Sequence, residues 1–201
     1  YSVNEEFSSR KKTKQVVVKT NIDPKNETNT ITTSDGQEFR VLATKSDPKT
    51  GFDGLAVAPI VNGEPDYKNV AVIAAGTDPG SPTKIDVGTA VAERESGLSP
   101  QYYVADRFVK EIMDDPRYEV SQLSGYSQGS YMLKVGAKYH IPTTTFNAWF
   151  FYRSLSNEEK AFIDKNPAMF IDYRRNYDLV VFGNDFNHPE LFNKSFLEMP
   201  D

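Results

Sequence analysis

The sequence predicts an α/β fold with a mostly parallel sheet flanked by helices and an N-terminal antiparallel extension. From residue 69 onward, apolar strand-like runs alternate with segments of helical periodicity. That alternation favours a parallel sheet whose strands are joined by right-handed helical crossovers. Before residue 63, short apolar runs are separated by turn residues, which is typical of antiparallel hairpins.

The N-terminal third is expected to contribute a tail and several short strands. Residues 1–14 are polar and charged and lack an apolar period, so we expect a flexible tail there. Asp35 and Gly36 supply turn chemistry between two strand-like runs. Strands are predicted at residues 15–20, 30–33, 38–44 and 55–61.

The rest of the chain is expected to form the core of the sheet. Residues 69–75 are apolar on both faces, as in a central strand covered by helices. The elements predicted after it are a helix at 100–114, a strand at 118–123, a helix at 128–139, a strand at 143–150, a helix at 157–165 and one or two strands at 169–182. No repeat or linker interrupts the pattern, so we expect one domain over residues 15–201, with the antiparallel extension at 15–62 and the core at 69–201.

Composition excludes several classes of function. The chain has 201 residues, a net charge of −5 and a pI near 5.2. This argues against nucleic acid as a partner, because phosphate binding needs clustered Lys and Arg. The chain has no cysteine, which excludes disulfides, thiolate metal sites and cysteine nucleophiles. Acidic residues lack metal-ligand spacing and the glycine-rich nucleotide motifs are absent, so we expect neither a metal nor a cofactor.

The compartment is indicated only weakly by the sequence. No apolar run reaches the roughly 18 residues that a membrane span requires. The chain begins at Tyr1, which favours a processed or trimmed product, and a larger parent polypeptide is open as its source. We expect a secreted or cell-surface bacterial protein, with the cytoplasm as the alternative.

The strongest local signal is the pentapeptide Gly-Tyr-Ser-Gln-Gly at residues 125–129. It matches G-x-S-x-G and lies between a predicted strand and a predicted helix, the context of a nucleophile elbow. Its two glycines leave room for the tight turn that exposes the serine oxygen. The backbone amide of Gln128, at the helix N-terminus, is suited to stabilise developing negative charge. Ser127 is therefore the candidate nucleophile, and a plain glycine-rich turn is the alternative.

Five segments resemble the class 3 lipases and their bacterial relatives, in that family's order. They are residues 69–78, which end in Gly-Thr-Asp, residues 99–108, the pentapeptide at 125–129, the Thr-Phe-Asn-Ala run at 145–148 and the Asn-Tyr-Asp-Leu-Val run at 176–180. The resemblance implies an α/β-hydrolase-like core in which Thr77 supplies a second oxyanion amide. It also implies that Asp178 is the acid of a catalytic triad; Asp172 and Asp185 are the alternative acids.

The chain departs from the family pattern at positions close to the candidate nucleophile. Family members usually have His before the serine and Leu after it, whereas this chain has Tyr126 and Gln128. Trp149 replaces the usual Pro after the Thr-Phe-Asn-Ala run. The first change places a polar side chain beside the oxyanion position, and the second is expected to alter the following loop.

A serine nucleophile needs a base, and the chain has two histidines. His140 follows a predicted helix and precedes Pro142, so we expect a helix C-cap or surface residue far from Ser127. His188 lies downstream of Asp178, in the Ser, Asp, His order of this fold. The gap of 10 residues between Asp178 and His188 is short for the family. The alternatives are a histidine that lies beyond a C-terminal truncation, a base supplied by another segment, and a site without a competent base.

The sequence therefore predicts a serine hydrolase that cleaves carboxylic esters through an acyl-enzyme on Ser127. The resemblance implies a lipase, phospholipase or esterase, with a small-molecule ester or lipid substrate and transient contact with a membrane surface. The alternative is a catalytically degenerate hydrolase-fold module that binds a partner and lacks a competent histidine. A peptidase would use the same triad.

Overall fold

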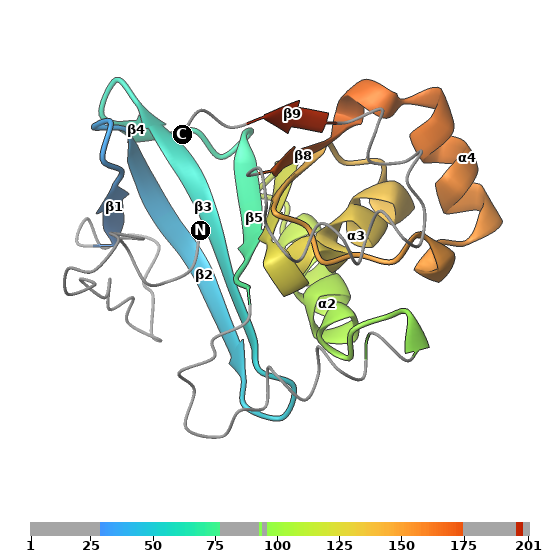
Figure 1. Cartoon of the computed structure of the whole chain (residues 1–201). Coiled ribbons are helices and arrows are strands. Elements are labelled where there is room, and N and C mark those ends of the chain that lie inside the picture. The colour runs from blue at the N-terminus through green and yellow to red at the C-terminus, as the bar shows by residue number, and fades with distance from the viewer. Residues whose placement is uncertain (1–28, 77–92, 94–95, 175–195, 199–201) are drawn as a thin grey trace.

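The computed structural model describes residues 29–76, 93, 96–174 and 196–198. Its strands form one mixed sheet in the order β1-β2-β3-β5-β6-β7-β8-β9, with β4 paired to β3 (Figure 1). The strands are β1 Thr30–Thr32, β2 Glu38–Asp47, β3 Phe52–Val61, β4 Glu64–Pro65, β5 Val70–Ala74, β6 Val120–Tyr126, β7 Thr143–Phe146, β8 Phe170–Arg174 and β9 Phe196–Glu198. The helices are α2 Gln101–Met113, α3 Met132–Tyr139 and α4 Asn157–Lys165, with short 3-10 turns η1 Ser127–Tyr131, η2 Tyr152–Ser154 and η3 Pro167–Met169.

The sheet changes direction between its two halves. Strands β1, β2, β3 and β5 pair antiparallel, whereas β5, β6, β7, β8 and β9 pair parallel. The predicted α/β architecture with an N-terminal antiparallel extension is thus confirmed for the described residues. The sheet is mixed and not mostly parallel, because the antiparallel pairing of the extension continues to β5. The strand predicted at residues 15–20 lies outside them. No helix in the described part of the chain is long and apolar enough to cross a membrane.

The register of the parallel half aligns the carboxyl ends of its strands. Gly125 in β6 pairs with Ala74 in β5 and with Thr145 in β7, and Thr145 pairs in turn with Asp172 in β8. Strands β5 to β8 therefore end side by side. We call this side of the sheet the carboxyl edge, and ligands of open α/β sheets bind outside such an edge.

Two buried clusters join the helices to the sheet. The larger contains Phe52 and Val72 from the sheet and Phe108 from α2, all at most 3% exposed. The smaller contains Leu133 of α3, Ile163 of α4 and Phe170 of β8. Burying each of these large side chains contributes about 1.5–3 kcal/mol. Helices α2, α3 and α4 lie on the same side of the sheet (Figure 1).

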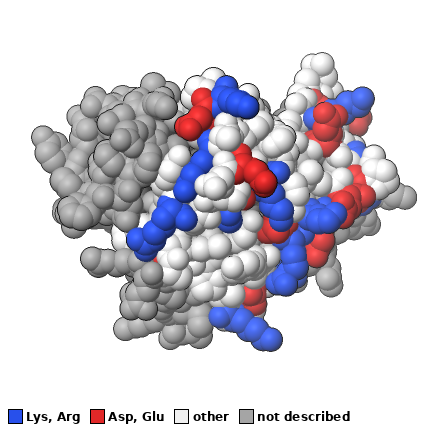
Figure 2. All heavy atoms as spheres, turned by 90° about the vertical axis from the view of Figure 1, so that its right-hand side faces the viewer, with Lys and Arg blue, Asp and Glu red and all other residues white. Residues whose placement is uncertain are grey.

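Salt bridges join neighbouring helices within this layer. Lys138 of α3 pairs with Asp106 of α2 at 2.8 Å, and Lys134 of α3 pairs with Glu159 of α4 at 2.7 Å. The second pair is the more buried, with side chains 12% and 11% exposed. Glu159 also closes a capping box with Ser156 at the start of α4. Acidic and basic side chains are interspersed across the face shown in Figure 2.

Three element boundaries differ from the sequence predictions near the carboxyl edge. β6 continues to Tyr126 because Gly125 still pairs on both sides. β7 ends at Phe146, well before residue 150, because Asn147 adopts a positive φ of 47° and breaks the strand. The helix predicted at 128–139 begins as the 3-10 turn η1 at Ser127.

Candidate active site

Ser127 directly follows β6 and has the left-handed backbone conformation. Its φ is 50°, whereas the preceding Tyr126 is extended with a φ of −116°. Non-glycine residues rarely adopt positive φ, and each such residue costs on the order of 1–3 kcal/mol. The chain thus reverses from strand to helix at a single strained residue, which is the backbone arrangement of a nucleophile elbow. The side chain of Ser127 is half-buried.

Both glycines of the pentapeptide are required by close backbone contacts. A Cβ on Gly125 would lie 2.1 Å from the carbonyl oxygen of Gly129. A Cβ on Gly129 would lie 2.7 Å from the carbonyl oxygen of Ala75, just after β5. Residues 125–129, called the elbow turn below, therefore fold back on themselves and pack directly on β5. Any larger residue at either position would force the backbone apart.

The chain leaving β5 passes beside Ser127. A Cβ on Gly76 would lie 2.7 Å from the carbonyl oxygen of Tyr126 and 3.2 Å from Cβ of Ser127. Residue 76 is thus in direct contact with the candidate nucleophile. Thr77, which follows in the sequence, lies outside the described residues, so its role in an oxyanion hole stays a prediction.

Gln128, the residue after the nucleophile, is 1% exposed and has a buried hydrogen-bond partner. Its side-chain Nε2 donates to Oγ of Ser99 over 3.3 Å. Ser99 is fully buried and also accepts a hydrogen bond from the backbone amide of Gln101 at 3.2 Å. The lipases that the sequence resembles usually have Leu at this position. The polar side chain of Gln128 is accommodated here because it forms a hydrogen bond with Ser99. The Gln128–Ser99 hydrogen bond joins residues 29 positions apart, and no local sequence pattern predicts it.

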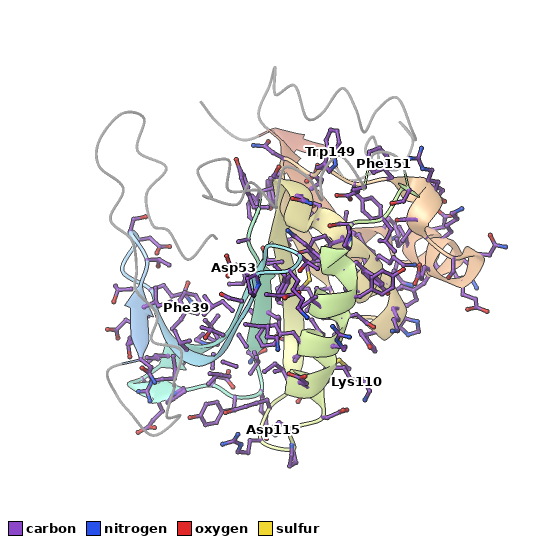
Figure 3. All side chains as sticks on the ribbon, turned by 90° about the horizontal axis from the view of Figure 1, so that it is seen from below. Phe39, Asp53, Lys110, Asp115, Trp149 and Phe151 are labelled. Atoms are coloured by element: carbon purple, nitrogen blue, oxygen red, sulfur yellow. The ribbon has the colours of Figure 1, made fainter. Side chains whose placement is uncertain are left out.

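The turn after β7 is joined to the elbow turn through the backbone. The amide of Trp149 donates to the carbonyl oxygen of Ser127 over 3.0 Å, a bond that the usual Pro could not make. The side chain of Trp149 packs edge to face on Phe151, with ring centroids 5.4 Å apart (Figure 3). Trp149 was expected to alter the loop after β7. In the structure, its backbone amide bonds this loop to the carbonyl oxygen of Ser127.

Asp172 of β8 forms hydrogen bonds that stabilise the turn after β7. It is 3% exposed and accepts hydrogen bonds from Oγ1 of Thr145 at 2.8 Å and from the backbone amide of Ala148 at 3.2 Å. These contacts give Asp172 a structural role in the turn after β7, and its prediction as an alternative triad acid stays open because His188 lies outside the described residues. Asp178 and Asp185, the other candidate acids, lie outside the described residues.

The two histidines differ in what the structure describes. His140 is the C-cap of α3, with a left-handed φ of 59°, and its exposed ring stacks on Phe162 at 3.9 Å. The prediction of a helix C-cap at this position is confirmed. His188 lies outside the described residues, so its role as the base stays a prediction.

Two buried polar atoms beside the elbow turn have no hydrogen-bond partner among the described residues. They are Oγ of Ser130, which directly follows the turn, and Nε1 of Trp149, whose backbone amide bonds Ser127. Glu93, which precedes Ser99 in the chain segment leading into α2, is also buried. Burial raises the pKa of Glu93 to about 9, so its carboxyl group is neutral at pH 7. Unsatisfied buried polar atoms are rare in folded proteins, and their concentration here marks a candidate functional region.

Several aromatic residues in the segments around the elbow turn belong to the core. Tyr102 and Phe150 lie in the two buried clusters, and Phe151 is also buried. Tyr103 on α2 is 60% exposed. The described residues contain no group of three His, Cys, Asp or Glu that could hold a metal ion.

The described part of the site brings together a strained serine, two tightly packed glycines, the chain leaving β5 and a buried glutamine. Comparisons with protein-family models, curated proteins and solved structures found no match. A function for this chain must therefore be argued from the geometry of the elbow turn and from the motifs in the sequence.

Proposed function

We propose that this chain is a serine hydrolase of the α/β-hydrolase type that cleaves carboxylic esters through an acyl-enzyme on Ser127. The observation that carries the proposal is the φ of 50° at Ser127, which lies between a strand and a helix at the carboxyl edge of the parallel half of the sheet. Strain of this kind is concentrated at functional sites, because surrounding contacts must maintain it. A plain glycine-rich turn would not need a strained serine.

In the proposed reaction, Oγ of Ser127 attacks the ester carbonyl while His188, oriented by Asp178, accepts the hydroxyl proton. The carbonyl oxygen becomes an oxyanion and accepts hydrogen bonds from the amides of Gln128 and Thr77. The alcohol leaves with the proton from the imidazolium, and water then cleaves the acyl-enzyme by the same steps to release the carboxylic acid. No cofactor or metal takes part.

Two described features support this arrangement of donors. Gly76, which directly precedes Thr77 in the sequence, lies close to Ser127. Gln128 directly follows the nucleophile and lies in the first turn of η1. Removing one oxyanion donor typically costs about 100- to 1,000-fold in turnover, so each of the amides of Gln128 and Thr77 would contribute strongly to the rate.

The lipase-like substrate range rests on the resemblance to class 3 lipases. Tyr126, Phe146 and Trp149 lie at or just after the carboxyl ends of β6 and β7 and are only partly buried, so these aromatic side chains are available to an apolar substrate. We therefore propose small-molecule esters, including lipid esters, as the substrate class. A bacterial protein that acts outside the cell or at its surface fits such a substrate.

Hydrolysis of p-nitrophenyl butyrate tests the proposal. The wild-type chain should release p-nitrophenol, and Ser127→Ala should abolish turnover while the far-UV circular dichroism spectrum is unchanged. Ser124→Ala is the matched control, because Ser124 lies in the same strand and pairs with Ile73 and Thr144. Activity that survives Ser127→Ala would refute the nucleophile. A folded wild-type chain without activity would favour the degenerate binding module.

A further inference from the structure

A set of buried polar side chains connects the elbow turn to the rest of the fold. Its members are Ser99 and Gln101 at the start of α2, and Gln128 and Tyr131 in η1. Each is at most 2% exposed, although they lie beside the main apolar cluster. We call these four residues the buried polar network.

The hydrogen bonds run from the β2–β3 turn to both ends of η1. Nε2 of Gln101 donates to the carbonyl oxygen of Thr50 at 3.0 Å, and its Oε1 accepts from the hydroxyl of Tyr131 at 3.2 Å. Oγ of Ser99 accepts two hydrogen bonds, one from the backbone N–H of Gln101 and one from the side-chain Nε2 of Gln128. The network therefore fixes η1 at its second residue and at its last residue.

Burial makes these hydrogen bonds expensive to break. A buried polar group that loses its partner costs about 1–3 kcal/mol, so rotation of the Gln128 side chain away from Ser99 is disfavoured. The side chain and the backbone amide of Gln128 share one Cα, and the Gly129 contact with β5 restricts the next peptide. The orientation of the Gln128 amide is thus coupled to Ser99.

We propose that Ser99 is a positioning residue for the oxyanion-binding amide of Gln128, acting through the Gln128 side chain. The inference rests on the proposed function, since it concerns a group that acts only if Ser127 is a nucleophile. An oxyanion donor must already point at the position of the developing charge, and a displacement of about 1 Å can cost about 100-fold in rate. In this chain a buried hydrogen bond from the Gln128 side chain to Ser99 holds the residue after the nucleophile.

A double-mutant cycle tests the coupling in the full chain. The variants are Ser99→Ala, Gln128→Leu and the double variant, assayed for kcat and KM with p-nitrophenyl butyrate. The second readout is the inhibition constant of butylboronic acid, whose tetrahedral adduct on a serine places an oxygen in the oxyanion hole. Gln122→Leu is the matched control, because Gln122 lies in β6 and bonds Thr144 outside the elbow turn.

Each single variant should lower kcat about tenfold with KM nearly unchanged, and should raise the boronate inhibition constant by a similar factor. The double variant should lose less than the product of the two single losses, because it removes both side chains of the Gln128–Ser99 hydrogen bond and leaves neither of them unpaired. The backbone amide of Gln101 loses its Ser99 acceptor in the Ser99→Ala variant and in the double variant alike, so it does not affect the coupling. Gln122→Leu should keep both constants. Tyr131→Phe, which removes one oxygen from the network, should give a smaller loss in kcat and serves if a single variant does not fold.

The outcomes separate the two proposals. Folded single variants with lowered thermal stability but unchanged kcat and unchanged boronate inhibition would show a purely structural network and overturn the role of Ser99. A wild-type chain that neither hydrolyses the ester nor binds the boronate would overturn the proposed function, and the role of Ser99 would fall with it.

Discussion

The backbone amide of Trp149 donates a hydrogen bond to the carbonyl oxygen of Ser127 over 3.0 Å. This bond joins the turn after β7 to the turn after β6 at the carboxyl edge of the sheet. Asp172 fixes the first of these turns through the amide of Ala148 and the hydroxyl of Thr145. The nucleophile is thus supported from the neighbouring strand as well as from its own helix, and the following substitutions separate support from catalysis.

Asp172→Asn and Asp178→Asn should have opposite effects. Asp172→Asn weakens hydrogen bonds to a buried carboxylate and should lower the free energy of unfolding by about 1–2 kcal/mol, with most of kcat retained below the melting temperature. Asp178→Asn should leave stability nearly unchanged and lower kcat by at least about 100-fold, because a triad acid orients the base. Urea unfolding and ester hydrolysis measure both quantities. The reverse pattern would identify Asp172 as the triad acid.

Alanine at either glycine of the elbow turn should destabilise the fold. Gly125→Ala and Gly129→Ala place a Cβ 2.1 Å and 2.7 Å from carbonyl oxygens, so we expect losses of at least about 2 kcal/mol in the free energy of unfolding. Gly36→Ala is the control, because its φ is 86° but no atom lies within 4 Å of the added Cβ. It should cost about 1 kcal/mol, from backbone strain alone. Equal losses at all three sites would argue against tight packing of the elbow turn on β5.

Glycine should be better tolerated than alanine at position 127. Ser127→Gly relieves the left-handed strain and Ser127→Ala retains it, so the glycine variant should be more stable by about 1 kcal/mol. At Ser124, in the middle of β6, the order should reverse, because glycine weakens a strand interior. Thermal unfolding of the four variants measures both differences. An alanine variant more stable than the glycine variant at 127 would contradict the strained elbow.

Glu93 should make the stability depend on pH. Burial raises its pKa from the ordinary 4.5 to about 9, so the folded chain keeps a proton that the unfolded chain releases. The free energy of unfolding should therefore fall as the pH rises between these two values. Glu93→Gln cannot titrate and should show a shallower decline between about pH 6 and about pH 8 in urea unfolding. Parallel curves for the two proteins would mean that Glu93 is not buried as a neutral acid.

Local patterns were sufficient to predict the order of elements. The alternation of apolar runs with helical periodicity predicted β5, α2, β6, α3, β7 and α4. The strand β5 was expected to be buried on both faces, but Val70, Val72 and Ala74 on one face are buried and Ala71 and Ile73 on the other are only partly buried. The position of His140 before Pro142 predicted a helix C-cap. The G-x-S-x-G pattern predicted a strand-to-helix turn at Ser127, and the positive φ agrees with it.

Contacts between distant residues could not be predicted from those patterns. The Gln128–Ser99 and Thr145–Asp172 hydrogen bonds depend on sheet register and helix packing, which no local motif encodes. Gly125 was not assigned to β6, because glycine disfavours strands and its pairing with Ala74 and Thr145 is tertiary. Asp178 and His188 lie outside the described residues, so their roles as acid and base stay predictions.

Covalent labelling by a fluorophosphonate probe tests the central claim most directly, because the probe reacts with an activated serine beside an oxyanion hole. Intact protein should gain one probe mass, and peptide mass spectrometry should locate it on Ser127. Heat-unfolded protein and Ser127→Ala should remain unlabelled. A folded wild-type chain that stays unlabelled at high probe concentration, or that carries the probe on another residue, would contradict the assignment of Ser127 as a nucleophile.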